Sequence, residues 1–306
     1  TLVENYVFEI DPKGDGTQIH ASAAFDGRYV WVVYNMPDPE GGFDVYFVRL
    51  DCNGQQAGDP VKVNTVDYND VDPDLAAGPD GVIIAWHSDN ASGARNMDIY
   101  YRVYNISGEP VMDADARLAM TRGGVEADYN SWMPKMAARA DGGFALTGAW
   151  GLEEAERFQV FYQLIGADGK LEGDARDAFF EKGVGQMYSD IAVDGDNIYL
   201  AWSREPDEEV ADTRVVRYDA EGTASGEPAV GFEGFDVTNP SLAVSVEETG
   251  NVVFLAANTS EGSESFIYMK DATGLNPGSQ YLRLGNSGKI SYSPVIASGE
   301  GGGAVA

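Results

Sequence analysis

The stretch DPDLAAGPDGVIIAWHSDNASGARNMDIYYRVYNISGEPV, residues 72–111, contains most of one copy of the unit that builds this chain. An Asp-Gly turn, Asp80-Gly81, precedes the apolar run Val82–Trp86. A second run, Ile99–Tyr104, leads into a turn that ends at Gly108. Both runs are rich in β-branched and aromatic residues and are too short for typical helices, so they predict strands.

The two turns of this unit recur along the whole chain as two ladders of glycines. The Asp-Gly-like ladder runs through Gly27, Gly81, Gly142, Gly195, Gly250 and Gly301, and the Asp-x-x-Gly-like ladder runs through Gly54, Gly108, Gly169, Gly222 and Gly274. The one long step follows Gly81 in the first ladder and Gly108 in the second, so both ladders share the insertion. A shared insertion indicates one structural unit copied along the chain, and a period of roughly fifty residues is typical of a propeller or array.

Each unit predicts four strands, A to D, with the Asp-Gly turn between A and B and the second turn between C and D. A four-stranded antiparallel sheet repeated at this period is a propeller blade. Ser293–Ala297 and Gly302–Ala306 resemble strands A and B of a further unit. The sequence therefore predicts an all-β fold, a six-bladed β-propeller that forms a single domain over residues 1–306. We expect the N-terminal strand Tyr6–Ile10 to close the last blade, with a missing strand of that blade beyond Ala306.

Composition limits the partners of this protein. The chain carries 50 acidic and 20 basic residues, a formal net charge of −30. Nucleic acids and anionic membranes are bound through Lys and Arg, so this charge argues against both. No apolar run is long enough to span a bilayer, and the single cysteine, Cys52, forms no internal disulfide. An acidic surface suits a salty or extracellular medium, so we expect an extracellular, cell-surface or periplasmic protein.

The connectors from strand D of one unit to strand A of the next contain a recurring aromatic residue. In known propellers these connectors and the B-to-C loops surround the channel on the face where ligands bind. The residues that we expect to contact a ligand there are Tyr68, Asn69, Tyr129, Asn130, Trp132, Tyr188 and Tyr292. Tyr and Trp combine an apolar body with a polar tip, which suits sugar rings. The alternative interpretation is a wedge that packs adjacent blades together.

Acidic residues supply two further hypotheses. The densest group of oxygen ligands is formed by Asp67, Asp70, Asp72 and Asp74, and it predicts a Ca²⁺ site, although its spacing is not that of an EF-hand. The B-to-C loops are acidic as well, and a glycosidase needs two carboxylates facing one sugar bond. The sequence does not show which carboxylates would pair. The two histidines, His20 and His87, belong to no recognisable catalytic or metal motif.

One blade motif resembles a known group of proteins. Its elements are Pro73-Asp-Leu-Ala76, Asp80-Gly81, Ala85-Trp86, Asp98-Ile99-Tyr100 and Gly108-Glu-Pro110. This pattern is similar to repeats of large secreted bacterial β-propellers, including those attached to surface adhesins and exoproteins. The resemblance implies a secreted or cell-surface propeller that binds a glycan or protein, or serves in a larger surface assembly. The alternative is a carbohydrate-active enzyme, a glycosidase or lyase, although the sequence lacks the repeated boxes of sialidases.

Overall fold

The structure is a computed structural model in which no helix and 24 β-strands are described. It describes residues 19–39, 41–66, 68–89, 97–126, 130–152, 156–206, 211–231, 237–247, 250–259, 265–271, 281–284, 297–299 and 303–305. Over these ranges there is no helix long and apolar enough to cross a membrane.

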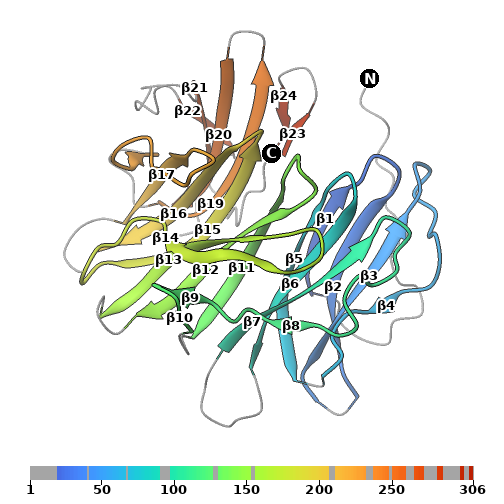
Figure 1. Ribbon diagram of the computed structural model, residues 1–306. Coiled ribbons are helices and arrows are strands. Elements are labelled where there is room, and N and C mark those ends of the chain that lie inside the picture. Colours follow the sequence, from blue (N-terminus) through green and yellow to red (C-terminus); the bar gives the residue numbers. More distant parts are fainter. Residues whose placement is uncertain are drawn as a thin grey trace.

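Five four-stranded antiparallel sheets follow one another along the chain, and each keeps its strands in sequence order (Figure 1). The first contains β1 (Ile19–Phe25), β2 (Val30–Pro37), β3 (Phe43–Leu50) and β4 (Val61–Lys62), and the second contains β5 (Asn69–Ala77), β6 (Gly81–Asp89), β7 (Met97–Asn105) and β8 (Ala116–Arg117). The third contains β11 (Ser131–Ala138), β12 (Phe144–Leu152), β13 (Arg157–Ile165) and β14 (Leu171–Asp177), and the fourth contains β15 (Gly185–Asp194), β16 (Asn197–Glu205), β17 (Asp212–Tyr218) and β18 (Ala229–Val230). The fifth contains β19 (Val237–Glu247), β20 (Gly250–Thr259), β21 (Ser265–Asp271) and β22 (Tyr281–Leu284), and two short pairs are β9 (Thr121–Arg122) with β10 (Val125–Glu126) and β23 (Ala297–Gly299) with β24 (Gly303–Val305).

The first strands of the five sheets lie side by side. Along the series β1, β5, β11, β15 and β19, each strand contacts the next, and β19 also contacts β23 (Figure 1). Each sheet is therefore a blade whose first strand lies innermost, which confirms the all-β fold and the predicted strand order. The pair β23–β24 confirms an A–B hairpin after the fifth blade. Tyr6–Ile10, which would close a sixth blade, lies outside the described residues.

Buried aromatic side chains form the core between blades. Trp31, Trp86, Trp150 and Trp202 are completely buried. Trp31 of the first blade and Trp86 of the second share one apolar cluster, and Trp202 of the fourth blade packs in a cluster with Tyr162 of the third. A buried aromatic side chain removes about 150–250 Å² from water, so these residues hold neighbouring blades together.

The second ladder of glycines forms the turns between the third and fourth strands, as predicted. Gly54, Gly108, Gly169 and Gly222 have φ of 73°, 87°, 79° and 75°. A Cβ on Gly222 would lie 1.1 Å from Nη1 of Arg176 in the preceding blade, and Arg176 donates a hydrogen bond to the carbonyl of Glu221 at 2.7 Å. Tyr101 likewise donates to the carbonyl of Gly169 in the next blade, at 2.8 Å. These glycines therefore shape the turn and also let the preceding blade approach.

The first ladder marks the predicted A–B hairpins, but not with one conformation. Gly27, Gly142 and Gly195 have positive φ, as expected for tight turns. The hairpin at Asp80-Gly81 forms as predicted, but Gly81 is not among the positive-φ residues and lies at the start of β6. A Cβ there would be 2.6 Å from the carbonyl oxygen of Tyr104, so a close strand approach, not the turn, requires glycine.

Candidate functional site

Every complete blade has an irregularity at the same place in its first strand. In every case the pairing between the first and second strands shifts register, as in a β-bulge: two residues of the first strand lie opposite one residue of the second. The first strands concerned are β1, β5, β11, β15 and β19. Each slip contains a non-glycine residue with positive φ. These residues, which we call the bulge ring, are His20 (51°), Asp72 (50°), Met133 (56°), Tyr188 (49°) and Asn239 (50°). Such φ values cost side-chain-bearing residues free energy, and bulges often redirect side chains next to active sites.

The sequence around the bulges explains how they are held. Proline follows three bulge residues, at Pro73, Pro134 and Pro240, and proline has no N–H to give to the strand ladder. The amide of Asp72 donates to Oδ1 of Asn35 in the preceding blade at 3.1 Å. The amide of Asn239 donates to Oγ of Ser203 in its own preceding blade, also at 3.1 Å. The adjacent blade thus fixes two of the five bulges, and a residue–proline step in the sequence marks three of them.

Two residues beyond each bulge residue stands a second set of polar side chains. This inner row consists of Ser22, Asp74, Lys135, Asp190 and Ser241. Ser22 Oγ donates to Oδ1 of Asp74 at 2.7 Å, and the amide of Met136 donates to Oδ2 of Asp74 at 2.9 Å. Asp74 therefore joins the first three blades, and both of its carboxylate oxygens are occupied.

Lys135 lies among three carboxylates of the site. Its Nζ is 3.7 Å from Oδ1 of Asp74, and the charges of Asp74, Asp190 and Asp72 all raise the pKa of its ammonium, Asp74 most. Its side chain is nevertheless 46% exposed. Lys135 is therefore open to water although three carboxylates act on its charge.

Asp190 is an inner-row carboxylate with a raised pKa. Its Oδ2 accepts the amide of Leu242 in the next blade at 2.7 Å, and its Oδ1 accepts the amide of Ile191 at 2.9 Å. Burial raises the pKa of Asp190 to about 6, although the positive charge of Lys135 acts in the opposite direction. Asp190 can therefore carry a proton at mildly acidic pH.

Both histidines of the chain meet Asp72 of the bulge ring. His20 Nδ1 pairs with Oδ1 of Asp72, and His87 Nε2 lies 3.6 Å from Oδ2. The side chain of His20 is 54% exposed, that of Asp72 37% and that of His87 only 5%. Burial lowers the pKa of His87, although the charge of Asp72 opposes this effect. The sequence alone did not indicate this cluster, because its members come from β1, β5 and β6.

The predicted ligand-binding residues occupy different places around this site. Tyr188 belongs to the bulge ring and is half-buried. Tyr68 is half-buried beside Tyr100, with ring centroids 6.4 Å apart. Asn69 begins β5 and is half-buried, and Asn130 is exposed. Trp132 packs on Phe158 of its own blade, with centroids 4.7 Å apart. Tyr129 and Tyr292 lie outside the described residues.

The predicted calcium ligands on β5 have separate protein partners. Asp70 is buried and accepts a hydrogen bond from Trp86 Nε1 at 3.0 Å, and burial raises its pKa to about 7. Asp72 faces the histidines, and Asp74 joins the inner row. Within the described residues, no group of three His, Cys, Asp or Glu side chains is placed to hold a metal ion. Asp67 lies outside those residues, and calcium stays a prediction.

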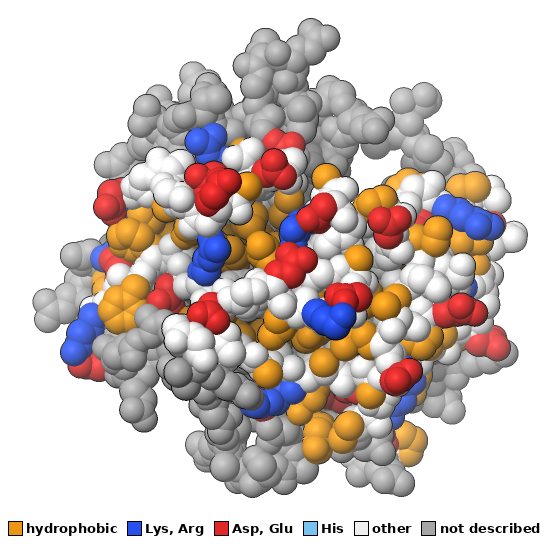
Figure 2. Space-filling model, in the orientation of Figure 1, with side chains coloured by type: hydrophobic (Ala, Val, Ile, Leu, Met, Phe, Trp, Pro, Cys, Tyr) orange, Lys and Arg blue, Asp and Glu red, His pale blue; other side chains and the backbone are white. Residues whose placement is uncertain are grey.

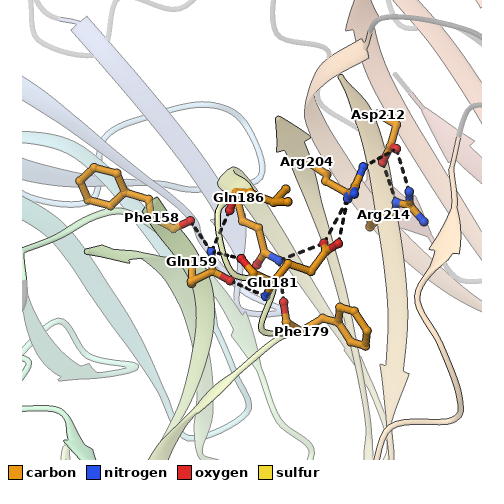
Figure 3. Close-up of polar contacts among 9 residues, drawn as sticks. Phe158, Gln159, Phe179, Glu181, Gln186, Arg204, Asp212 and Arg214 are labelled. Atoms are coloured by element: carbon orange, nitrogen blue, oxygen red, sulfur yellow. Dashed lines mark hydrogen bonds and ion pairs between the residues drawn. The ribbon is translucent and has the colours of Figure 1, made fainter. Parts of the chain in front are cut away.

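A buried amide network fixes the connector that leads to Tyr188 (Figure 3). Gln159 donates to the carbonyl of Val184 at 2.8 Å and accepts the amide of Glu181 at 3.0 Å. Gln186 accepts the amide of Val160 at 3.2 Å, and Arg204 Nε lies 3.1 Å from the Glu181 carboxylate. Both glutamines are completely buried, so this connector is anchored before β15 begins.

The opposite end of the inner strands has a pocket of a different kind. It has a volume of about 380 Å³, and the A–B turns line it, among them Phe25, Pro79, Arg139 and Asp194. Arg139 is already paired with Asp141 and Glu172. Figure 2 shows acidic and basic side chains interspersed over the described part of one face, with no continuous basic patch there.

Comparison with solved structures supports the fold. The chain is similar to a GH43 endo-arabinanase from Bacillus licheniformis, with 13% identity, coverage of 85% of this chain and 95% of that chain, and a TM-score of 0.43. It is similar to the hemagglutinin-neuraminidase ectodomain of parainfluenza virus 5, with 8% identity, coverage of 90% and 73%, and a TM-score of 0.51. A variant of the Synechocystis apocarotenoid oxygenase gives 12% identity, coverage of 90% and 62%, and a TM-score of 0.52. No family model and no curated protein matches the chain. At these identities the likeness shows a shared β-propeller fold alone.

Proposed function

We propose that this protein is a carbohydrate-active enzyme that hydrolyses a glycosidic bond at the bulge ring. The observation that carries the proposal is a pair of carboxylates whose charges both act on Lys135. Asp72 has a side chain that is 37% exposed, and Asp190 has a raised pKa. Glycosidases use two carboxyl groups of this kind, because one must donate a proton while the other acts as a carboxylate. The arabinanase and neuraminidase similarities agree with this proposal at the level of fold, and they do not supply its residues.

The surroundings of the three carboxylates assign their roles. Asp190, with its pKa raised to about 6, is the proton donor to the leaving oxygen as the glycosidic C–O bond breaks. Asp72, whose side chain is 37% exposed at the ring, is the second carboxylate: it takes a proton from the water whose oxygen bonds to the anomeric carbon. Asp74 is assigned a supporting role, since its side chain is only 10% exposed and it joins three blades through Ser22 and the amide of Met136. Lys135 offsets the repulsion between these acids.

Aromatic residues at the ring suit a sugar substrate. Tyr188 is half-buried at its bulge, and Tyr68 is half-buried in the connector before β5. A half-exposed tyrosine ring can stack on the apolar face of a pyranose or furanose while its hydroxyl contacts the sugar hydroxyls. These two residues are therefore assigned to substrate binding.

A second candidate function is glycan binding without turnover. It is favoured by the hydrogen bonds from the next blade to Asp74 and Asp190, because carboxylates that join blades have a structural role independent of catalysis. The two candidates predict different results for a conservative change at Asp190.

The test is release of reducing ends from a panel of polysaccharides, measured for the wild type and two variants. Asp190→Asn removes the proton donor, and we expect a loss of about a hundredfold or more in kcat with the substrate still bound. Asp194→Asn changes a carboxylate on the same strand at the opposite end and should retain activity. Binding without release by the wild type would favour the non-catalytic candidate.

The wider setting is also part of the proposal. We propose a six-bladed ring, a secreted bacterial protein located outside the cell or at its surface, and a glycan as the principal ligand. Support comes from the repeat motif, the net charge of −30 and the β23–β24 hairpin after the fifth blade. A protein partner within a surface assembly and a bound calcium ion are further proposals that rest on the sequence.

A further inference from the structure

The position of His87 in its blade is the starting observation. By strand register, His87 opposes Val71 of β5 as Asn35 opposes Ile19 and Ser203 opposes Met187. Asn35 and Ser203 each accept the bulge amide of the following blade. His87 occupies the equivalent position in the second blade, but it faces Asp72 on its own inner strand.

The environment of His87 does not satisfy its imidazole. The residue is 4% exposed, and its Nδ1 has no hydrogen-bond partner in the described part of the chain. Its Nε2 lies 3.6 Å from Asp72, which is longer than a normal hydrogen bond. A buried polar group without partners is costly, so its retention at this place calls for a role beyond packing.

His20 approaches the same carboxylate from the solvent side. Its side chain is 54% exposed, and it pairs with the other oxygen of Asp72. An exposed partner can leave when a ligand arrives, whereas a buried one cannot move away without opening the blade. His20 is therefore an exposed partner of Asp72 that can move away, whereas His87 is a buried partner that cannot.

We propose that His87 is a positioning residue that holds Asp72 in its working orientation, while His20 is an exchangeable partner that the substrate displaces. This inference rests on the proposed function and assigns the regulation of the same site. The charged and titratable groups that act on His87 are Asp72 from β5 and His20 from β1. Substrate binding should then depend on the side chain of His20, and turnover should depend on that of His87.

The first test does not require turnover. The chain contains only two histidines, so their Cε1–H signals can be followed separately in an NMR pH titration. Asp72→Asn removes the shared carboxylate, whose charge raises the pKa of His87, so we expect the His87 titration to shift to lower pH. Asp194→Asn, at the opposite end of β15, should leave the His87 titration unchanged. An unchanged His87 titration in Asp72→Asn would overturn the proposal.

The second test separates the two histidines by kinetics. His87→Asn installs the residue found at the equivalent place in the first blade, so the blade should remain folded. We expect kcat to fall about tenfold or more and the pH profile to change shape, with KM little affected. His20→Asn should instead lower KM and leave kcat near the wild-type value. Equal effects of both variants on kcat would contradict the division of roles.

The two tests also distinguish this inference from the proposed function. A His87 titration that depends on Asp72, in a protein that hydrolyses no glycan, would refute the enzyme proposal and leave the pairing intact. Glycan hydrolysis in a protein whose His87 titrates independently of Asp72 would refute the positioning role and leave the enzyme proposal intact.

Discussion

At the scale of the residue, equivalent backbone positions in the five blades carry different side chains. The bulge ring places histidine, aspartate, methionine, tyrosine and asparagine at equivalent points around the inner strands. The inner row does the same with serine, aspartate and lysine. Because the backbone is common to the blades, the chemistry of the site depends on which side chain each copy contributes. Single substitutions therefore test it cleanly, with another blade as the control.

Asp70 is expected to limit stability at high pH. Burial raises its pKa to about 7 from an ordinary value of 3.8, so the folded state holds a proton that the unfolded chain releases. The amount by which Asp70 lowers the free energy of unfolding therefore grows as pH rises from about 4 to about 7. Asp70→Asn keeps an acceptor for Trp86 and removes the charge.

We expect Asp70→Asn to stabilise the protein at pH 8, by on the order of 2 kcal/mol more than at pH 5. Urea unfolding at the two pH values measures this difference. An equal effect at both would mean that Asp70 does not titrate in this range.

Lys135 is expected to control the pH dependence of activity. Its positive charge lowers the pKa of Asp190, but burial is the larger effect and leaves that pKa raised to about 6. If Asp190 is the proton donor, activity should decline as pH rises through that value. Lys135→Met removes the charge, so the decline should move to higher pH. The pH profile of kcat/KM measures the shift, and a move to lower pH would contradict the assignment.

At the scale of the element, the turns and bulges show which features sequence patterns reveal. The glycine ladders predicted the hairpins and their order, because a turn with positive φ favours glycine strongly. Gly81 showed the limit, since a glycine required by a neighbouring carbonyl has the same sequence signature as one required by a turn. The bulges were missed because their residues share backbone geometry but not side-chain type.

Two glycines separate the cost of the turn from the cost of contact between blades. Both Gly195 and Gly222 have positive φ, but a Cβ on Gly195 meets no atom within 4 Å, whereas one on Gly222 collides with Arg176. Gly195→Ala should cost about 1 kcal/mol from backbone strain alone. Gly222→Ala should cost at least about 1 kcal/mol more, because Arg176 loses its bond to Glu221. Thermal or urea unfolding compares them, and equal costs would argue against the contact.

At the scale of the whole molecule, the predicted all-β propeller of four-stranded blades is confirmed and the site is only partly anticipated. The connectors were predicted to supply the residues that contact a ligand, and one of those residues, Tyr188, belongs to the bulge ring. Asp72 was predicted as a calcium ligand, but His20 and His87 join it from strands distant in sequence. Pairing of carboxylates across blades depends on how blades pack around the axis, and no local spacing encodes that.

The most direct measurement is a crystal structure of the Asp190→Asn variant with an oligosaccharide released or bound in the polysaccharide screen. We expect a sugar at the bulge ring, stacked on Tyr188. Its glycosidic oxygen should lie next to residue 190, and a hydroxyl or the anomeric carbon should face Asp72. A sugar bound instead in the pocket at the A–B turns, or on the outer strands of the blades, would contradict it.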